Sequence, residues 1–81
     1  MTYVVRISVM LRDGIADPQG QTIQRALPAL GYSNMSDVRV GKRIDLAVDA
    51  QSEHEARARA EDLCKRLLAN PVLESFEVSI A

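Results

Sequence analysis

Aromatic residues and cysteine are scarce in this sequence of 81 residues, which has no tryptophan, one phenylalanine, two tyrosines and one cysteine. A surface that stacks nucleic-acid bases needs several exposed aromatic rings, and an internal disulfide needs a second cysteine. Because a single histidine accompanies the single cysteine, the ligands of a structural zinc site are also missing. These shortages argue against base stacking, disulfides and zinc, and the lone thiol suits a reducing cytoplasm.

Neither sign of charge predominates, because 11 aspartates and glutamates balance 10 lysines and arginines and leave a formal net charge of -1. Such a balance gives no long-range attraction to nucleic acid or to an anionic membrane. No apolar run approaches the roughly 18–20 residues that span a bilayer, and the N-terminal segment has no signal-peptide pattern. We therefore expect no nucleic-acid partner, no membrane partner and a cytoplasmic location.

The short length has a consequence for assembly. We expect a single domain over residues 1–81. A core of this size buries about 60–65% of the surface that the unfolded chain exposes and supplies roughly 3–5 kcal/mol. Because no disulfide or metal adds to this stability, we expect the chain to associate with itself or with other chains.

The hydrophobic pattern predicts an α+β chain of the order β-α-β(β)-α-β, an antiparallel sheet with two helices on one face. Period-two alternation predicts strands over residues 3–11 and 72–80, the second with Val72 facing inward. Apolar residues at helical spacing predict helices over residues 17–30 and 52–70. The second helix has an apolar stripe of Ala56, Ala60, Leu63, Cys64, Leu67 and Leu68.

Signals at the helix ends support these boundaries. Asp17 is typical of an N-cap and Pro18 of a first helical position, whereas Pro28 predicts a kink or an early end. Ser52 and Glu55 have the spacing of a capping box at the start of the second helix.

Residues 36–49 are the most informative segment, because their apolar side chains all fall on even numbers from Val38 to Val48. A two-residue turn after Val40 would pair the apolar face of one strand with the polar face of the other. Two arrangements keep the faces consistent: a three-residue loop over residues 41–43, or one bent strand over 36–49 with a bulge at Gly41. We favour the single strand, which at about 3.3 Å per residue would be about 46 Å long and would need a second copy to cover its free half.

Residues able to support catalysis are isolated from one another. His54 stands beside two glutamates at a helix start with no nucleophile nearby, and Cys64 lies on the apolar stripe, as a packed thiol would. Arg39, Lys42 and Arg43 are a candidate phosphate site, but Asp37 and Asp45 flank them, and we interpret them as members of cross-strand ion pairs. The sequence therefore predicts no catalytic residue and no metal site.

The segment Asp17-Pro18-Gln19-Gly20 is unusual for a helix start, because a glycine inside the first turn allows close approach by another backbone or by an anion. It is the only candidate pocket for a small ligand. Two functions therefore remain open, an assembly subunit and a small-molecule-binding regulatory α+β module.

Four sequence blocks occur in an order and spacing that resemble one family, the PurS subunit of phosphoribosylformylglycinamidine (FGAM) synthase. The blocks are Asp17-Pro18-Gln19-Gly20, Ala26-Leu27 with Leu30-Gly31-Tyr32, Asp37-Val38-Arg39-Val40-Gly41-Lys42, and the run from Leu63 to Val72. The resemblance covers essentially the whole chain. It implies ferredoxin-like subdomains in which a long central strand, residues 36–49, is shared across a dimer.

The resemblance also implies a function, in de novo purine biosynthesis. The chain would be a homodimer or homotetramer without catalytic residues that bridges the synthetase subunit PurL and the glutaminase subunit PurQ and supports ammonia transfer. The complex would convert FGAR to FGAM with ATP and glutamine, and ATP and magnesium would belong to the synthetase, with no cofactor in this chain. Candidates for the docking or dimer surfaces are the signature residues Asp17, Pro18, Gln19, Gly20, Arg39, Gly41, Lys42, Asn70 and Pro71.

Overall fold

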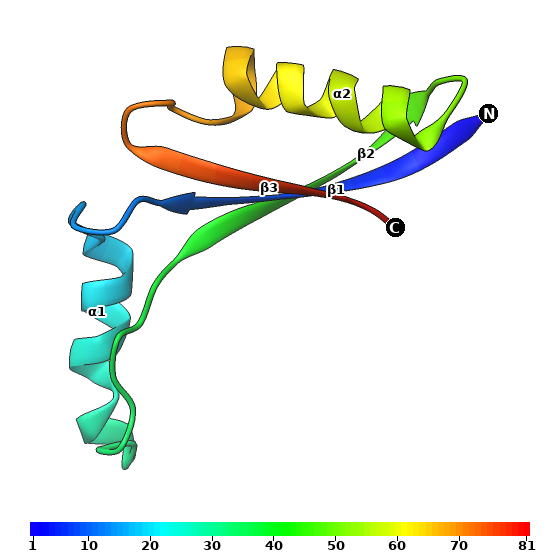
Figure 1. Cartoon of the computed structure of the whole chain (residues 1–81). Helices are drawn as coiled ribbons and strands as arrows, with labels where there is room; N and C mark the ends of the chain where they lie inside the picture. Colours follow the sequence, from blue (N-terminus) through cyan, green and yellow to red (C-terminus); the bar gives the residue numbers. More distant parts are fainter.

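The computed structural model, which describes residues 1–81, contains three strands and two helices (Figure 1). The elements are β1 (Thr2–Leu11), α1 (Pro18–Ala26), β2 (Gly41–Asp49), α2 (Glu53–Leu63) and β3 (Glu74–Ile80), with a 3-10 turn η1 (Pro28–Leu30) and a π-helical turn η2 (Cys64–Leu68). The predicted α+β class and element order are confirmed. Neither helix is long and apolar enough to cross a membrane.

β1 is the central strand of an antiparallel sheet of order β2-β1-β3. Ile7 of β1 lies opposite Ile44 of β2 and Val78 of β3, so apolar side chains of all three strands share one face. α2 covers that face (Figure 1). The fully buried core consists mainly of Val5, Ile7, Val9, Ala56, Ala60 and Cys64. Because alanines line the helix, α2 can approach the sheet closely.

The predicted strand over residues 36–49 is a single strand without a hairpin, but it is shorter than expected. β2 begins at Gly41 and pairs with β1 without a bulge, from Gly41 opposite Met10 to Asp49 opposite Thr2. It is an edge strand of the sheet and not the central one. Residues 36–40 lie outside the sheet and form no regular secondary structure. A strand needs a hydrogen-bonded neighbour, and within one chain none runs beside these residues. The left-handed backbone of Asp37, with φ of 56°, also interrupts the run.

The prediction of two helices on one sheet face is right for α2 only. α1 projects away from the sheet within a segment, residues 12–40, that we call the arm (Figure 1). Its apolar stripe therefore packs on no strand of its own chain, and Ile23 and Leu30 are 46% and 69% exposed. The helix ends at Ala26 because Pro28 cannot donate a backbone hydrogen bond, as the sequence predicts.

The C-terminal part of the second predicted helix also differs from expectation. Regular α-helix ends at Leu63 and the chain continues as the π-helical turn η2, in which Ala69 N donates to Cys64 O at 3.0 Å. The wider turn rotates Leu67 out of the apolar stripe, so that this side chain is 74% exposed. Val72, predicted to face inward, is 76% exposed because β3 begins only at Glu74.

Candidate functional site

The nine signature residues lie at one end of the sheet, where β1 ends and β2 and β3 begin. Three separate stretches of sequence meet there: the first turn of α1, the segment that returns from the arm into β2, and the turn before β3. The candidate site is therefore the junction between the arm and the sheet.

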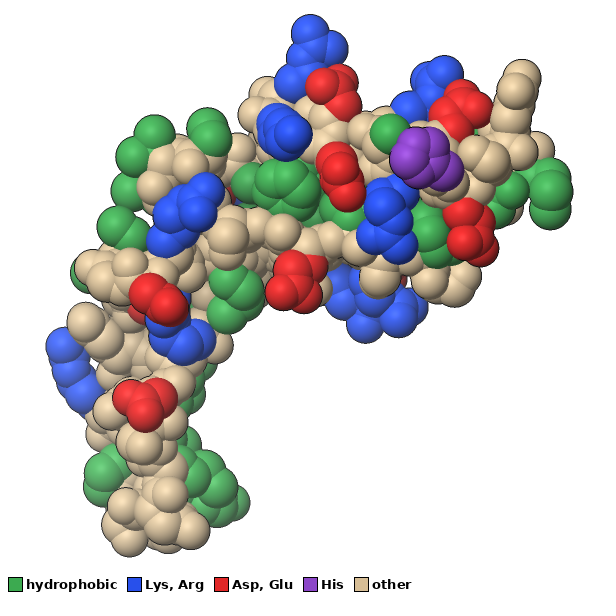
Figure 2. Space-filling model, in the orientation of Figure 1, with side chains coloured by type: hydrophobic (Ala, Val, Ile, Leu, Met, Phe, Trp, Pro, Cys, Tyr) green, Lys and Arg blue, Asp and Glu red, His purple; other side chains and the backbone are tan.

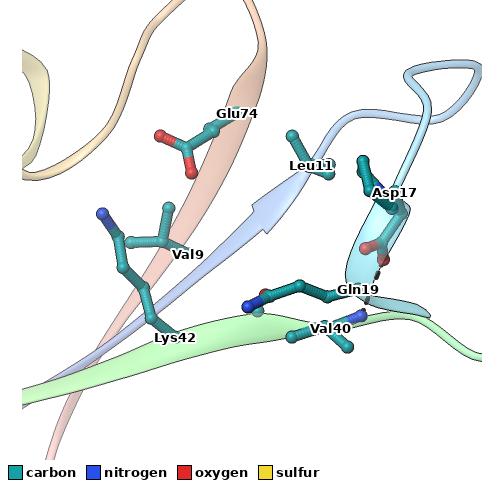
Figure 3. A pocket seen from close by; sticks show the side chains of 9 residues that line it. Val9, Leu11, Asp17, Gln19, Val40, Lys42 and Glu74 are labelled. Atoms are coloured by element: carbon teal, nitrogen blue, oxygen red, sulfur yellow. Dashed lines mark hydrogen bonds between the residues drawn. The ribbon is translucent and has the colours of Figure 1, made fainter. Parts of the chain in front are cut away.

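Asp17 joins the outgoing and returning parts of the arm. Its Oδ1 accepts a hydrogen bond from Gly20 N at 2.9 Å, the N-cap that the sequence predicts, and its Oδ2 accepts one from Val40 N at 2.8 Å (Figure 3). Only 8% of the residue is exposed. We call Asp17, Gly20 and residues 38–40 the clasp, because their contacts fix the direction in which α1 leaves the sheet.

Two glycines permit the close approaches at this junction. A Cβ on Gly20 would collide with the carbonyl oxygen of Val38 and lie 2.8 Å from Oδ2 of Asp17. A Cβ on Gly41 would collide with the sulfur of Met10 and lie 2.6 Å from Val9 O. Both positions therefore require glycine for lack of space and not for backbone freedom.

Arg39 fastens the returning segment to the end of β1. Its guanidinium donates to Leu11 O at 2.7 Å and lies 3.5 Å from the carboxylate of Asp13 and 3.9 Å from that of Asp17. The prediction of cross-strand ion pairs is wrong for the other two cations: Arg43 pairs at 2.9 Å with Asp45 of its own strand, and Lys42 has no carboxylate within ion-pair distance.

Hydrogen bonds from the backbone of Val40 and Gly20, helped by the nearby charge of Arg39, lower the pKa of Asp17 below its ordinary value of 3.8. Because the folded-state pKa is the lower one, the stabilisation is complete above about 3.8 and disappears as pH falls through the folded value. We expect Asp17→Asn to lower the melting temperature near neutral pH, and we expect the difference from the wild type to shrink as pH falls below about 3.8. Thermal unfolding of both proteins across this range checks it, and a constant difference would contradict the assignment.

A hollow of about 370 Å³ opens beside the clasp. Lys42 of β2 and Glu74 of β3 reach into it from opposite sides, and Gln19 of α1 lies at its border (Figure 3). Val9, Leu11 and Val40 form its apolar floor. It is the place where the regulatory alternative would need its ligand, and it is lined by one cation, Lys42, and two carboxylates, Asp17 and Glu74, with no serine, threonine, cysteine or histidine.

The remaining reactive groups provide neither a metal site nor an exposed thiol. No group of three or more histidine, cysteine, aspartate and glutamate side chains is arranged to hold a metal ion. Cys64 is fully buried beneath α2, and burial raises the pKa of its thiol. The hydrogen bonds of Asp17 and the close contacts at Gly20 and Gly41 thus hold α1 in a fixed direction away from the sheet. These features define a small α+β protein that functions through the surfaces that it presents to other chains.

Comparisons with known proteins identify the family. The family model PurS, phosphoribosylformylglycinamidine (FGAM) synthase, matches residues 4–81. The PurS subunit of Methanocaldococcus jannaschii is 37% identical over 78 residues, which are 96% of this chain and 94% of the relative. The crystal structure of the Thermotoga maritima PurS subunit is 33% identical, with a TM-score of 0.92 over 100% of this chain and 93% of that one. The chain belongs to the PurS family of FGAM synthase.

A second structural likeness involves a complex. A chain in the structure of PurLQS from Thermotoga maritima matches with a TM-score of 0.92 and 33% identity over 100% of this chain and 99% of that one. The predicted family, and with it the prediction of a non-catalytic subunit of a purine-biosynthetic ligase, are confirmed. The docking role of the nine signature residues remains a prediction.

Sequence reasoning missed a second surface, a groove between β2 and α2. It has a volume of about 320 Å³ and an apolar lining of Leu46, Val48, Ala60 and Leu63, with Arg59, Asp62 and Arg66 at its rim. The even-numbered pattern of β2 indicates which side chains are apolar. It does not indicate that α2 would leave two of them, Leu46 and Val48, only half covered.

Proposed function

We propose that this chain is the assembly subunit that bridges the synthetase PurL and the glutaminase PurQ of FGAM synthase and supports ammonia transfer between them. The likeness of the whole chain to a subunit in the PurLQS structure carries the proposal. PurL uses ATP and magnesium, this chain holds no cofactor, and the complex works in the cytoplasm.

We also propose that the chain is a homodimer or homotetramer in which copies exchange their arms. The apolar stripe of α1 and the apolar groove between β2 and α2 are complementary in character. The two surfaces cannot meet within one chain, because α1 points away from the sheet in a molecule that extends 51 Å (Figure 1). The α1 of a second copy would cover the groove and supply the second helix on that face of the sheet, as in a ferredoxin-like subdomain.

The two sheet edges support the same arrangement. Met1 and Ala50 exchange backbone hydrogen bonds, so by alternation the polar backbone groups of Arg43, Asp45 and Ala47 point to the free edge of β2. On β3, the outward carbonyl of Val78 already accepts a hydrogen bond from Arg57 at 2.5 Å. A strand would therefore add at β2, and residues 36–40 of a second copy, which belong to no strand of their own sheet, are candidates for it.

Reconstitution with purified PurL and PurQ tests the bridging role. We expect glutamine-dependent FGAM formation to rise several-fold when the chain is added, and the chain alone to have neither glutaminase nor synthetase activity. With ammonium salt as the nitrogen source the rise should be much smaller, because transfer between subunits is bypassed. An unchanged glutamine-dependent rate would contradict the bridging role.

A further inference from the structure

An apolar patch of Leu67, Pro71, Val72 and Leu73 surrounds the turn between α2 and β3, and we call it the turn patch. All four residues are exposed, Leu67 by 74% and Val72 by 76%. Figure 2 shows hydrophobic side chains gathered where this turn lies, beyond the C-terminal end of α2. Clustered exposed apolar side chains on a small protein are typical of an interaction site.

The backbone beneath the turn patch is held in place by side chains. Oδ1 of Asn70 accepts hydrogen bonds from Val72 N at 3.0 Å and Leu73 N at 3.4 Å, and Oε1 of Glu74 accepts one from Asn70 N at 2.8 Å. From the start of the arm, the guanidinium of Arg12 donates to Pro71 O at 3.0 Å. Asn70 and Pro71, two of the predicted docking residues, thus shape the turn that presents the patch.

This arrangement would be costly in a protein that never used the patch. Ordering a turn costs conformational entropy, and here the ordering leaves apolar side chains in water. The same ordering favours binding, because a surface that is already rigid loses little entropy when a partner docks. η2 contributes by turning Leu67 outward, and π-helical turns are frequent at functional sites.

The charges around the turn patch indicate what kind of surface covers it. Lys65 and Arg66 precede Leu67 in η2 and are exposed, and Arg12 lies against Pro71. Arg66 pairs with Asp62 at 3.6 Å and Glu74 accepts a hydrogen bond from the backbone of Asn70, whereas Lys65 has no carboxylate within ion-pair distance. In a symmetric dimer formed through the turn patch, the cations of one copy would lie opposite the same cations of the other, and the like charges would repel.

We propose that the turn patch docks a different subunit of FGAM synthase, through an apolar pocket of that subunit rimmed by aspartates or glutamates. The inference rests on the proposed function and assigns one surface to it. The turn patch lies between α2 and β3, whereas the arm and the groove beside β2 would serve association between copies. The two kinds of assembly can therefore be disrupted separately.

The experiment compares assembly of PurL and PurQ, with glutamine, ATP and magnesium present, on wild type and on Val72→Asp. We expect Val72→Asp to bind the other subunits at least about tenfold more weakly. The substitution removes a central apolar contact and places a carboxylate beside the acidic rim of the partner's pocket. Lys65→Glu should weaken binding as well, whereas Val4→Asp, at an exposed valine on the uncovered sheet face, should not. Light scattering should show an unchanged homo-oligomer for every variant.

The outcomes separate the two proposals. If Val72→Asp assembles with PurL and PurQ as well as the wild type does, the docking role of the turn patch is overturned and the bridging function is not. Loss of the homo-oligomer in Val72→Asp, with its circular dichroism retained, would also overturn it, because the patch would then face a second copy. Failure of the wild type to assemble at all would instead refute the bridging function.

Discussion

Replacing Ile23 by aspartate should convert the homo-oligomer into a monomer of 8.9 kDa. The side chain is 46% exposed in a single chain, so little of its own core is lost, but the arm exchange would bury the new carboxylate in an apolar groove. An unpaired buried charge costs about 3–5 kcal/mol, which raises a dissociation constant by a factor of about 100 or more. Light scattering at micromolar concentration measures the mass.

Matched variants show which surface is responsible. Gln21→Asp adds the same charge on the opposite side of α1 and should leave the mass unchanged. Leu46→Asp, in the groove that would receive the arm, should give the same monomer as Ile23→Asp. Ala47→Asp, the next residue on the other face of β2, should not. An Ile23→Asp protein of unchanged mass would exclude the arm exchange.

Substituting alanine for Gly20 should destabilise the chain, although the same change in an exposed helix normally stabilises by about 1 kcal/mol. The sign reverses here because the added methyl group would collide with the carbonyl of Val38 and crowd the carboxylate of Asp17. Overpacking of this kind costs about 1–3 kcal/mol. The free energy of unfolding in denaturant checks this prediction.

A control on the same helix keeps the result interpretable. Gln21→Ala, one residue further along α1, should leave the stability unchanged or slightly higher, because its side chain is exposed. A Gly20→Ala protein as stable as Gln21→Ala would mean that residues 38–40 do not lie against the first turn of α1 in solution. The clasp would then not fix the direction of the arm.

Local chemistry predicted much of the fold. Asp17 and Pro18 begin α1, Pro28 ends it early, and Ser52 caps α2 by accepting a hydrogen bond from Glu55 N at 3.1 Å. These features depend on neighbours within one turn, so their sequence signals are strong. The parity argument for residues 36–49 also excluded a hairpin with a two-residue turn correctly, because the side-chain period of a strand is strictly two, and of the two arrangements that it left open the favoured single strand is the one observed.

The errors arose where a distant neighbour decides the structure. Periodicity shows that one face of α1 is apolar but not which chain covers it, so the helix was expected on its own sheet. The same limit applies to residues 36–40, whose pattern is that of a strand although no partner strand is available in one chain. At η2 a single extra residue in the turn moved Leu67 outward, and no local signal predicted it.

The site residues were only partly accessible to sequence reasoning. The signature blocks were found, yet their meeting point depends on the clasp, in which Asp17 contacts Val40 across 23 positions of sequence. The requirement for glycine at positions 20 and 41 follows from backbone and side-chain atoms that lie against them only in the folded chain. Spacing along the chain contains no information about such contacts.

The hydrogen bond from Arg57 to Val78 O makes the two borders of the sheet unequal. A sheet with two receptive borders can recruit further molecules without limit and grow into ribbons or fibrils. A guanidinium group that already engages a carbonyl in the middle of β3 disfavours addition at that border, so growth is limited once the other border is filled. This asymmetry favours closed particles of fixed size, and it protects a small, partly apolar polypeptide from polymerising at the concentrations at which it must meet its enzyme.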